Sequence, residues 1–313
     1  MTASETLFTR ETVDAMRAAV RETVERTPVT DIHTHLYAPA FGGLLLWGVD
    51  ELLTYHYLIA EVVRASRIDP ARFYAKSKRE QADFIWQTLF IERSPYSEAC
   101  RGVLTVLDRL GLDVASRDLA AFRDYFAQQT VEGYIDTVFE RANLESVVMT
   151  NDPFDDAERP VWEAGTAVDK RFHAALRIDP VLNNWATACA RLKGWGYDVD
   201  ETLSGTALAE TRRFLADWLK KTRALYMAVS LPQDFVYPED SARARLIAEC
   251  IVPVAKEHNV PFAMMIGVKR AVNPALKLAG DGVGKSDVGA VERLCAAYPD
   301  ARFMVTMLAR EDQ

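Results

Sequence analysis

Six short apolar runs that end in polar residues recur along the chain and predict buried strands. They are rich in apolar and β-branched residues, and helical patterns separate them. The runs cover residues 29–36 (VTDIHTHL), 145–153, 172–180, 225–232, 260–270 and 301–312. Strands that alternate with helices indicate parallel β/α units, arranged as an α/β barrel or a doubly wound sheet. In a barrel, the chemistry lies at the carboxyl ends of the strands, where these runs become polar.

The segment between the first two strands has a strongly helical pattern. Four of its residues share one face of an expected helix at spacings of 4, 3 and 4: Leu52, His56, Ile59 and Val63. Ser94 and Pro95 form an N-cap and first-turn pair, so another helix is expected from there to Gly111. An amphipathic helix is also expected over residues 11–26, and further helices over "DLAAFRDYF" and "GYIDTVFERA".

These patterns divide the chain into three units. Residues 1–36 hold an N-terminal helix and the first strand, residues 37–143 a helical insertion, and residues 144–313 the remaining β/α units. An eight-stranded (β/α)8 TIM-type barrel needs two strands more than these six. The sequence is therefore expected to lack a C-terminal portion of the native protein, and the alternative is an open six-stranded sheet.

Composition and charge restrict the class of protein. Apolar residues make up 49% and charged residues 26%, which is ordinary for a soluble globular chain. The net charge of -8 argues against nucleic acid or an anionic membrane as the main partner, but it leaves an anionic small substrate open. The chain has no apolar signal region or membrane-length run, and its four cysteines form no C-x-x-C pair. A cytoplasmic protein with reduced, mostly buried thiols is expected, and its oligomeric state, a homo-oligomer included, stays open.

The first strand carries the clearest chemical signal, because His33 and His35 are two residues apart. Such side chains point to the same face, about 6–7 Å apart at the backbone, and both can reach one metal ion. The alternative is a pair of surface histidines on a loop. Asp31 lies on the same face, as a partner of the histidines or as a capped polar residue. A third ligand is expected from an Asp or Glu, or from sequence outside the given chain.

The other histidines are interpreted differently. His173 opens the third strand and His258 lies in a loop before the fifth, so both are expected to be structural. His56 lies on an apolar helix stripe, and its spacing alone favours a buried core histidine. A functional interpretation requires that helix to lie over the barrel mouth, where His56 and Tyr57 would face the metal.

Arg177 ends an otherwise apolar strand, where a buried guanidinium is costly unless an anion pairs with it. It can bind a substrate carboxylate through two parallel hydrogen bonds. The alternative is an internal ion pair with Asp179 or Asp152. The glycine-rich stretch "GDGVGK" (280–285) lacks the full phosphate-loop pattern, and is interpreted as a flexible loop near the rim of the site.

The ordered combination of these motifs resembles the uronate isomerases, a branch of the metal-dependent amidohydrolase superfamily. The motifs are "TDIHTHL", "DELLTYHYL", "VVMTNDPFDD", "FHAALRIDP", "MMIGVKR" and "TMLARED", in this order. The resemblance implies a (β/α)8 barrel with a helical insertion after its first strand. It also implies isomerisation of D-glucuronate to D-fructuronate, and of D-galacturonate to D-tagaturonate, through an ene-diol.

The resemblance also assigns residue roles. His33 and His35 match the metal pair of one divalent ion, expected to be zinc. His56 and Tyr57 match a catalytic His-Tyr pair, which replaces the core interpretation of His56, and Arg177 matches a substrate-binding arginine. The family's third ligand, an Asp on the eighth strand, would lie beyond Gln313.

Two departures from the larger branch of the family stand out. Met265 occupies a position that holds a histidine there, and "AVSLPQD" replaces an Asp-His pair near the fourth strand. The rival functions are a mononuclear metal-dependent hydrolase and a non-catalytic protein that binds sugar acids. The middle strands offer neither further histidines nor a lysine for carboxylation, which argues against a binuclear hydrolase.

Overall fold

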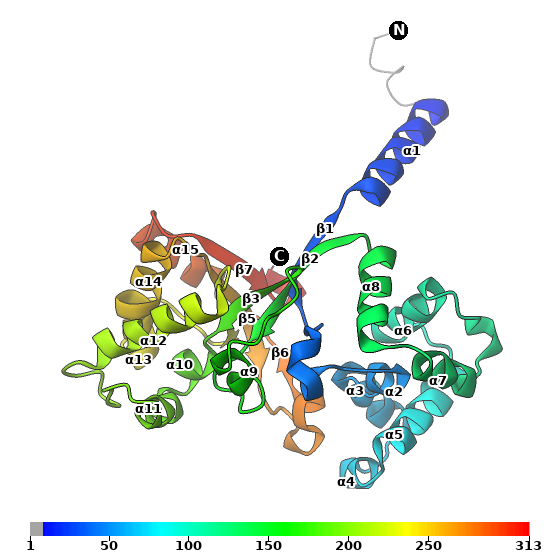
Figure 1. Ribbon diagram of the computed structural model, residues 1–313, viewed down its shortest axis with the longest axis horizontal. Helices are drawn as coiled ribbons and strands as arrows, with labels where there is room; N and C mark the ends of the chain where they lie inside the picture. Colours follow the sequence, from blue (N-terminus) through cyan, green and yellow to red (C-terminus); the bar gives the residue numbers. More distant parts are fainter. Residues whose placement is uncertain (1–8, 313) are drawn as a thin grey trace.

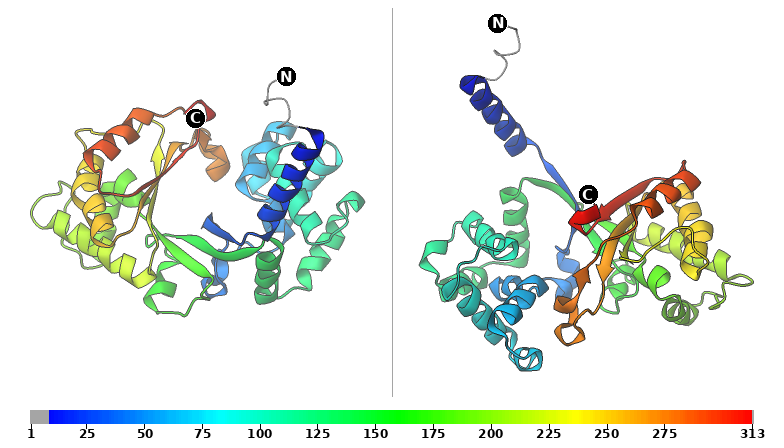
Figure 2. Two further views of the ribbon diagram at one scale, coloured as in Figure 1. Left: turned by 90° about the horizontal axis from the view of Figure 1, so that it is seen from above. Right: turned by 180° about the vertical axis from the view of Figure 1, so that it is seen from behind.

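Six parallel strands form a sheet that curls into a half-barrel, and each lies in one of the six predicted runs (Figure 2). The computed structural model describes residues 9–312. The strands are β1 (Val29–Thr34), β2 (Leu144–Asn151), β3 (Phe172–Arg177), β4 (Met227–Pro232), β5 (Phe262–Lys269) and β7 (Phe303–Met307). The prediction of these strands is therefore confirmed.

The order of the strands separates the two architectures that the sequence left open. Each parallel strand pairs with its neighbour in the chain, in the order β1-β2-β3-β4-β5-β7. A doubly wound sheet reverses its strand order at a switch point, whereas a barrel is wound in one direction only. The sequential order and the curl identify the TIM-barrel type of fold.

Side chains alternate between the two faces of the sheet. In β5, Phe262, Met264 and Ile266 are almost fully buried in the core under the outer helices. The opposite, inner face has a separate small cluster. Its members are Val148, Ala175 and Tyr226, with Ala228, Ala263 and Met304 packed against them. The two faces of the sheet therefore carry separate apolar clusters, the larger one under the helices.

Helices after β2 cover the outer face of the sheet (Figure 1). They are α9 (Arg159–Glu163), α10 (Asp179–Asn183), α11 (Trp185–Gly194), α12 (Ala207–Thr222), α13 (Ala242–Leu246), α14 (Val252–Glu257) and α15 (Val288–Ala297). A π-helical turn, η4 (Ile247–Ile251), joins α13 to α14. Trp218 and Phe214 of α12 lie in the largest apolar core, between these helices and the sheet.

Between β1 and β2, a group of helices packs around a second apolar core beside the sheet (Figure 1). The elements are η1 (Pro39–Leu44), α2 (Val49–Leu53), α3 (His56–Ser66), α4 (Pro70–Tyr74), α5 (Lys78–Ile85), η2 (Trp86–Ile91), α6 (Glu98–Arg109), η3 (Val114–Ser116), α7 (Leu119–Ala127) and α8 (Val131–Arg141). This agrees with the helical pattern, while the proposed unit boundaries at residues 36 and 143 stay predictions.

Two details of these helices correct the sequence interpretation. The stripe from Leu52 to Val63 does not belong to one helix, because the chain is extended at Tyr55 and α3 begins at His56. The other helix, α6, begins at Glu98 rather than after Ser94. Ser97 is its N-cap, since its hydroxyl accepts from the backbone N–H of Cys100 at 3.1 Å.

The connection after β5 joins the half-barrel to the helical insertion. Its turn, η5 (Pro274–Gly280), packs on the insertion: the Tyr74 hydroxyl donates to the Leu276 carbonyl at 2.7 Å, and Ala279 enters the insertion core. A Cβ on Gly280 would lie 1.9 Å from the Asn273 carbonyl oxygen, so only glycine fits there. The next residues form β6 (Gly282–Val283), antiparallel to β5, so the prediction of a flexible loop over 280–285 is wrong at this strand.

The N-terminal helix α1 (Arg10–Arg26) confirms the predicted amphipathic helix and projects away from the rest of the chain (Figure 1). Its apolar residues Met16, Val20 and Val24 are exposed. Residues 1–8 of the predicted N-terminal unit lie outside the described residues.

The remaining sequence-level expectations concern thiols and membranes. All four cysteines are free, and three of them are buried. No helix within residues 9–312 has the length and apolarity that crossing a membrane requires. The described chain ends in a short turn, η6 (Arg310–Asp312).

Candidate active site

The carboxyl end of β1 places the two histidines of the H-x-H motif side by side. The ring centroids of His33 and His35 are 5.5 Å apart, and the ring planes are nearly perpendicular at 86°. Both residues are partly exposed at the strand end rather than packed in the core. Asp31 caps the strand end locally, since its Oδ1 accepts from the backbone N–H of His33 at 3.1 Å. The structure thus brings together two imidazoles on one strand end.

Both imidazoles favour the neutral form. Partial burial lowers the pKa of His33 below its usual value, and the positive charge of Arg177 lowers it further. Partial burial also lowers the pKa of His35, with additional contributions from His33, Arg177 and His56. Neutral imidazole is the form that binds a metal ion.

These properties fit the histidine part of a zinc site. Two neutral imidazoles offer two nitrogen ligands, whereas catalytic zinc ordinarily has three protein ligands and one open position. Across residues 9–312, no group of three or more His, Cys, Asp or Glu side chains is arranged to hold a metal ion. The described chain therefore supplies a pair of suitable ligands, and the metal stays a prediction.

The first turn of α3 carries His56 and Tyr57 toward the same strand end. Tyr55 joins the two groups: its ring centroid is 6.5 Å from that of His35 and 4.3 Å from that of His56. The ring of Tyr57 lies 4.2 Å from that of His56 and is 61% exposed. His56 is half-buried, so it is not the fully buried core histidine that its spacing alone favoured.

The electrostatic surroundings of His56 come from a distant part of the sequence. Partial burial lowers the pKa of His56; Asp281 next to β6 opposes this shift, and Arg270 adds to it. Asp281 is itself held in place, since its carboxylate accepts from Arg270 at 2.5 Å and from the backbone N–H of Ala271 at 2.7 Å. This pair was not predicted from the sequence, because nothing in the local pattern shows that η5 packs on the insertion.

Arg177 lies at the carboxyl end of β3 on the same face as the histidines. Its Nε donates to Oδ2 of Asp179 at 3.2 Å, and the side chain is 31% exposed. Asp152 and Tyr37 lie near enough to influence its pKa as well. One internal ion pair that the sequence suggested is therefore formed. It occupies only Nε, and no described residue forms a hydrogen bond with Nη1 or Nη2.

A buried carboxyl group beside Asp152 was not predicted from the sequence. Glu158 is 1% exposed, and it accepts hydrogen bonds from the backbone N–H of Asp152 and from the indole of Trp162, both at 3.0 Å. Burial raises its pKa to about 7, and the hydrogen bonds only partly oppose that shift. Nothing in "NDPFDDAERP" distinguishes this acid from its exposed neighbours Asp155 and Asp156.

Glu158 is expected to make stability depend on pH. Its pKa rises from 4.5 unfolded to about 7 folded, so the folded chain holds a proton that the unfolded chain releases between these values. The stabilising contribution, about 3 kcal/mol, is complete below pH 4.5 and is lost as the pH rises through 7. Urea unfolding from pH 5 to pH 8 should show this decline in wild type and a flatter profile in Glu158→Gln. Glu163→Gln on exposed α9 should keep the wild-type slope; equal slopes in all three proteins would contradict the assignment.

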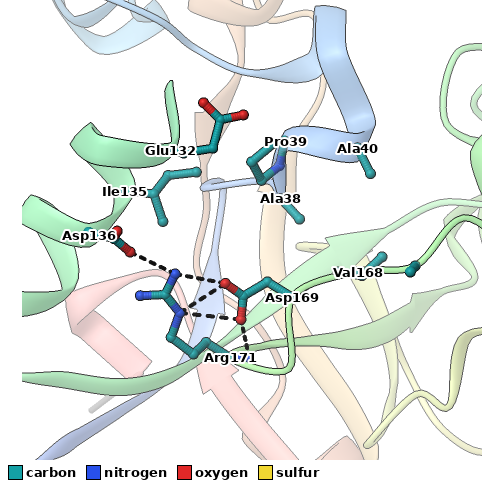
Figure 3. Close-up of a pocket in the computed structure, with 10 residues that line it drawn as sticks. Ala38, Pro39, Ala40, Glu132, Ile135, Asp136, Val168, Asp169 and Arg171 are labelled. Atoms are coloured by element: carbon teal, nitrogen blue, oxygen red, sulfur yellow. Dashed lines mark hydrogen bonds and ion pairs between the residues drawn. The ribbon is translucent and has the colours of Figure 1, made fainter. Parts of the chain in front are cut away.

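A separate cavity of about 290 Å³ lies between η1, α8 and the segment before β3 (Figure 3). None of the predicted site residues lines it. Its one arginine, Arg171, is engaged by Asp169 at 2.7 Å and by Asp136 at 2.8 Å. The cavity therefore lies apart from the histidine pair and offers no free cation.

The remaining sequence candidates lie away from the histidine pair or offer no ligand. His173 is near the start of β3, at the opposite end from Arg177, and His258 follows α14. Met265 pairs with Ser230 of β4 and Thr306 of β7. It stands where the larger branch of the resembled family has a histidine. These neighbours provide no histidine or carboxylate for a second metal ion.

Comparison with solved structures finds similar proteins, among them two uronate isomerases and a glucuronate isomerase. A uronate isomerase from Bacillus halodurans C-125 is 55% identical, with a TM-score of 0.93, over 96% of this chain and 71% of that one. A uronate isomerase from Thermotoga maritima (TM-score 0.71) and a glucuronate isomerase from Caulobacter crescentus (TM-score 0.66) are each 16% identical. The match with the Thermotoga protein covers 93% of this chain and 73% of that one. The match with the Caulobacter protein covers 99% of this chain and 74% of that one. No family model and no curated protein matches the sequence.

Proposed function

The chain belongs to the uronate isomerase family, and from this we propose that it interconverts D-glucuronate and D-fructuronate, and D-galacturonate and D-tagaturonate. Each reaction moves a carbonyl group from C1 to C2 of an open-chain sugar acid. The C2 proton is removed, an ene-diol forms, and a proton returns at C1. No oxidant or reductant is consumed, because the carbonyl and hydroxyl carbons exchange oxidation states within one molecule.

The substrate carries a carboxylate, which needs a positively charged anchor. Arg177 supports this role, since it lies on the face of the histidine pair with Nη1 and Nη2 unbonded within the described chain. A planar guanidinium binds a carboxylate or two neighbouring hydroxyls through parallel hydrogen bonds. We assign Arg177 to this anchoring.

Proton transfer between C2 and C1 requires a group that accepts and returns a proton near neutral pH. The lowered pKa of His56 keeps its imidazole neutral and able to accept the C2 proton. The exposed Tyr57 hydroxyl, beside His56, is suited to donate to the developing oxyanion. The two side chains are assigned as base and acid.

His33 and His35 would hold one divalent ion, zinc in this proposal. When bound, such an ion supplies Lewis-acid polarisation of a substrate oxygen. The histidine pair supports this assignment by its neutral state and by the 5.5 Å separation of the rings. The imidazoles would hold the ion at the strand end, on the face that Arg177 shares.

The observation that carries the proposal is the 55% identity with a uronate isomerase over 96% of the chain. The zinc-loaded protein should convert D-glucuronate and D-galacturonate to ketoses, and a chelator should stop the conversion. A colorimetric ketose assay measures both effects. D-Glucose, which lacks the carboxylate, is the matched control and should not react. Absence of ketose from both uronates would overturn the proposal, and uronate binding without turnover would favour the sugar-acid-binding rival.

Cysteine use and net charge support the location and the partners of the protein. Free, mostly buried thiols support a cytoplasmic location. The net charge of -8 supports a small anionic substrate held by local cations, rather than nucleic acid, as the partner.

A further inference from the structure

Asp179 contacts two neighbouring strands at the point where β3 and β4 separate. Its Oδ2 accepts from Nε of Arg177, and its Oδ1 accepts from the backbone N–H of Ser230, both at 3.2 Å. Only 16% of its side chain is exposed. The carboxylate is therefore fixed from two directions, by a side chain of β3 and by the backbone of β4.

The short ladder between these strands explains why a side chain is needed there. β3 and β4 are in register only at Leu176 with Met227 and at Arg177 with Ala228. Beyond that point β3 turns into α10, and Ser230 has no β3 backbone partner. Asp179 accepts its N–H, and Asn183 donates to its carbonyl at 2.8 Å. Two side chains of α10 thus make the hydrogen bonds to Ser230 that the β3 backbone does not make.

This arrangement also sets the direction of Arg177. A guanidinium is planar, so a hydrogen bond at Nε fixes the plane and leaves the Nη1 and Nη2 groups at its free end. Arg177 acts electrostatically on both His33 and His35, which places its charge beside the histidine pair. An unrestrained arginine would have many rotamers and would lose more entropy on binding a substrate.

We propose that Asp179 is a positioning residue that holds the Nη1 and Nη2 groups of Arg177 toward the sugar-acid substrate. The proposal rests on the proposed function. Asp179 does not touch the substrate, and it acts through Arg177. Because the anchor acts on the bound sugar acid before and after proton transfer, its misplacement should affect substrate binding more than turnover.

A double-mutant cycle tests the coupling. Asp179→Asn keeps an oxygen for the Ser230 N–H but removes the charge at Nε, and it should raise KM for D-glucuronate about tenfold while kcat stays within about threefold. In an Arg177→Lys background, the same substitution should change kcat/KM by less than about twofold. Fully additive effects would overturn the proposal, because Asp179 would then act independently of Arg177.

The chain offers a matched control at the other end of the same strand. Asp169 pairs with Arg171 at the same two-residue spacing, away from the histidine pair. Asp169→Asn should leave KM and kcat unchanged. An effect equal to that of Asp179→Asn would show that loss of such a pair near either end of β3 is enough, and would overturn the proposal.

A measurement without substrate separates this inference from the proposed function. In ¹⁵N-labelled protein, the Nε–H resonance of Arg177, assigned by its loss in Arg177→Lys, should be protected from exchange in wild type. It should shift and exchange rapidly in Asp179→Ala. An identical resonance in both proteins would overturn the positioning role. Absence of uronate binding and turnover in wild type, with the resonance shifted as expected, would overturn only the proposed function.

Discussion

His56→Asn is expected to lower the turnover of D-glucuronate about 100-fold or more, while the protein stays folded. A well-placed acid–base group contributes about 10²–10⁴-fold to a rate, and asparagine cannot accept the C2 proton. His56 is half-buried at the start of α3 and belongs to none of the apolar cores, so its loss should leave packing intact. Initial rates of ketose formation and the thermal unfolding midpoint measure the two effects.

The pH profile gives a second readout for His56. Because partial burial lowers its pKa, the base form persists below pH 6.5, and the wild-type rate should fall only at more acidic pH. In His56→Asn, the remaining rate should be low and should no longer show this fall at acidic pH. His258→Asn, on a histidine that follows α14, is the control and should behave as wild type. Turnover in His56→Asn close to that of wild type would remove His56 from the mechanism.

The strands were predictable from sequence because each buried strand needs a continuous apolar run. β2 and β5 show this directly, since both faces of each strand are largely covered. The curl of the sheet could not be predicted in the same way. It depends on the order in which the strands pair, and spacing along one strand does not contain this information.

The break between α2 and α3 shows where periodicity fails. Leu53 and Leu58 are buried on either side of it, so the apolar pattern continues although the helix does not. An extended residue at Tyr55 redirects the chain. The turn places the Tyr55 ring between His35 and His56, the first residue of α3. A pattern of spacings cannot detect a one-residue turn that preserves burial on both sides.

The candidate site was predictable to the extent that its residues lie on regular elements. His33, His35 and Arg177 follow from strand alternation and from the parallel order of the sheet. Asp281 and Glu158 do not, because their importance arises from tertiary contacts. Asp281 influences the pKa of His56 because η5 packs on the insertion, and Glu158 differs from nearby acids only by its burial.

His33→Ala and His35→Ala are each expected to weaken zinc binding at least about 100-fold, because each removes one of few protein ligands. Both rings are exposed at the end of β1, so the substitutions should leave no buried cavity and should not unfold the chain. Metal content after dialysis, together with competition against a chromophoric chelator, measures the affinity independently of activity. Ketose formation should fall in parallel with bound zinc.

His173→Ala is the matched control for the histidine pair. It removes a half-buried strand imidazole at the opposite end of β3 from Arg177, so zinc content and turnover should stay at the wild-type level. If His33→Ala and His35→Ala instead kept one tightly bound zinc ion per chain, the ion would be held elsewhere. The histidine pair would then need another role, since two neutral imidazoles beside Arg177 are suited to accept hydrogen bonds from sugar hydroxyls as well. Loss of zinc from both variants, with retention in His173→Ala, selects metal binding over that alternative.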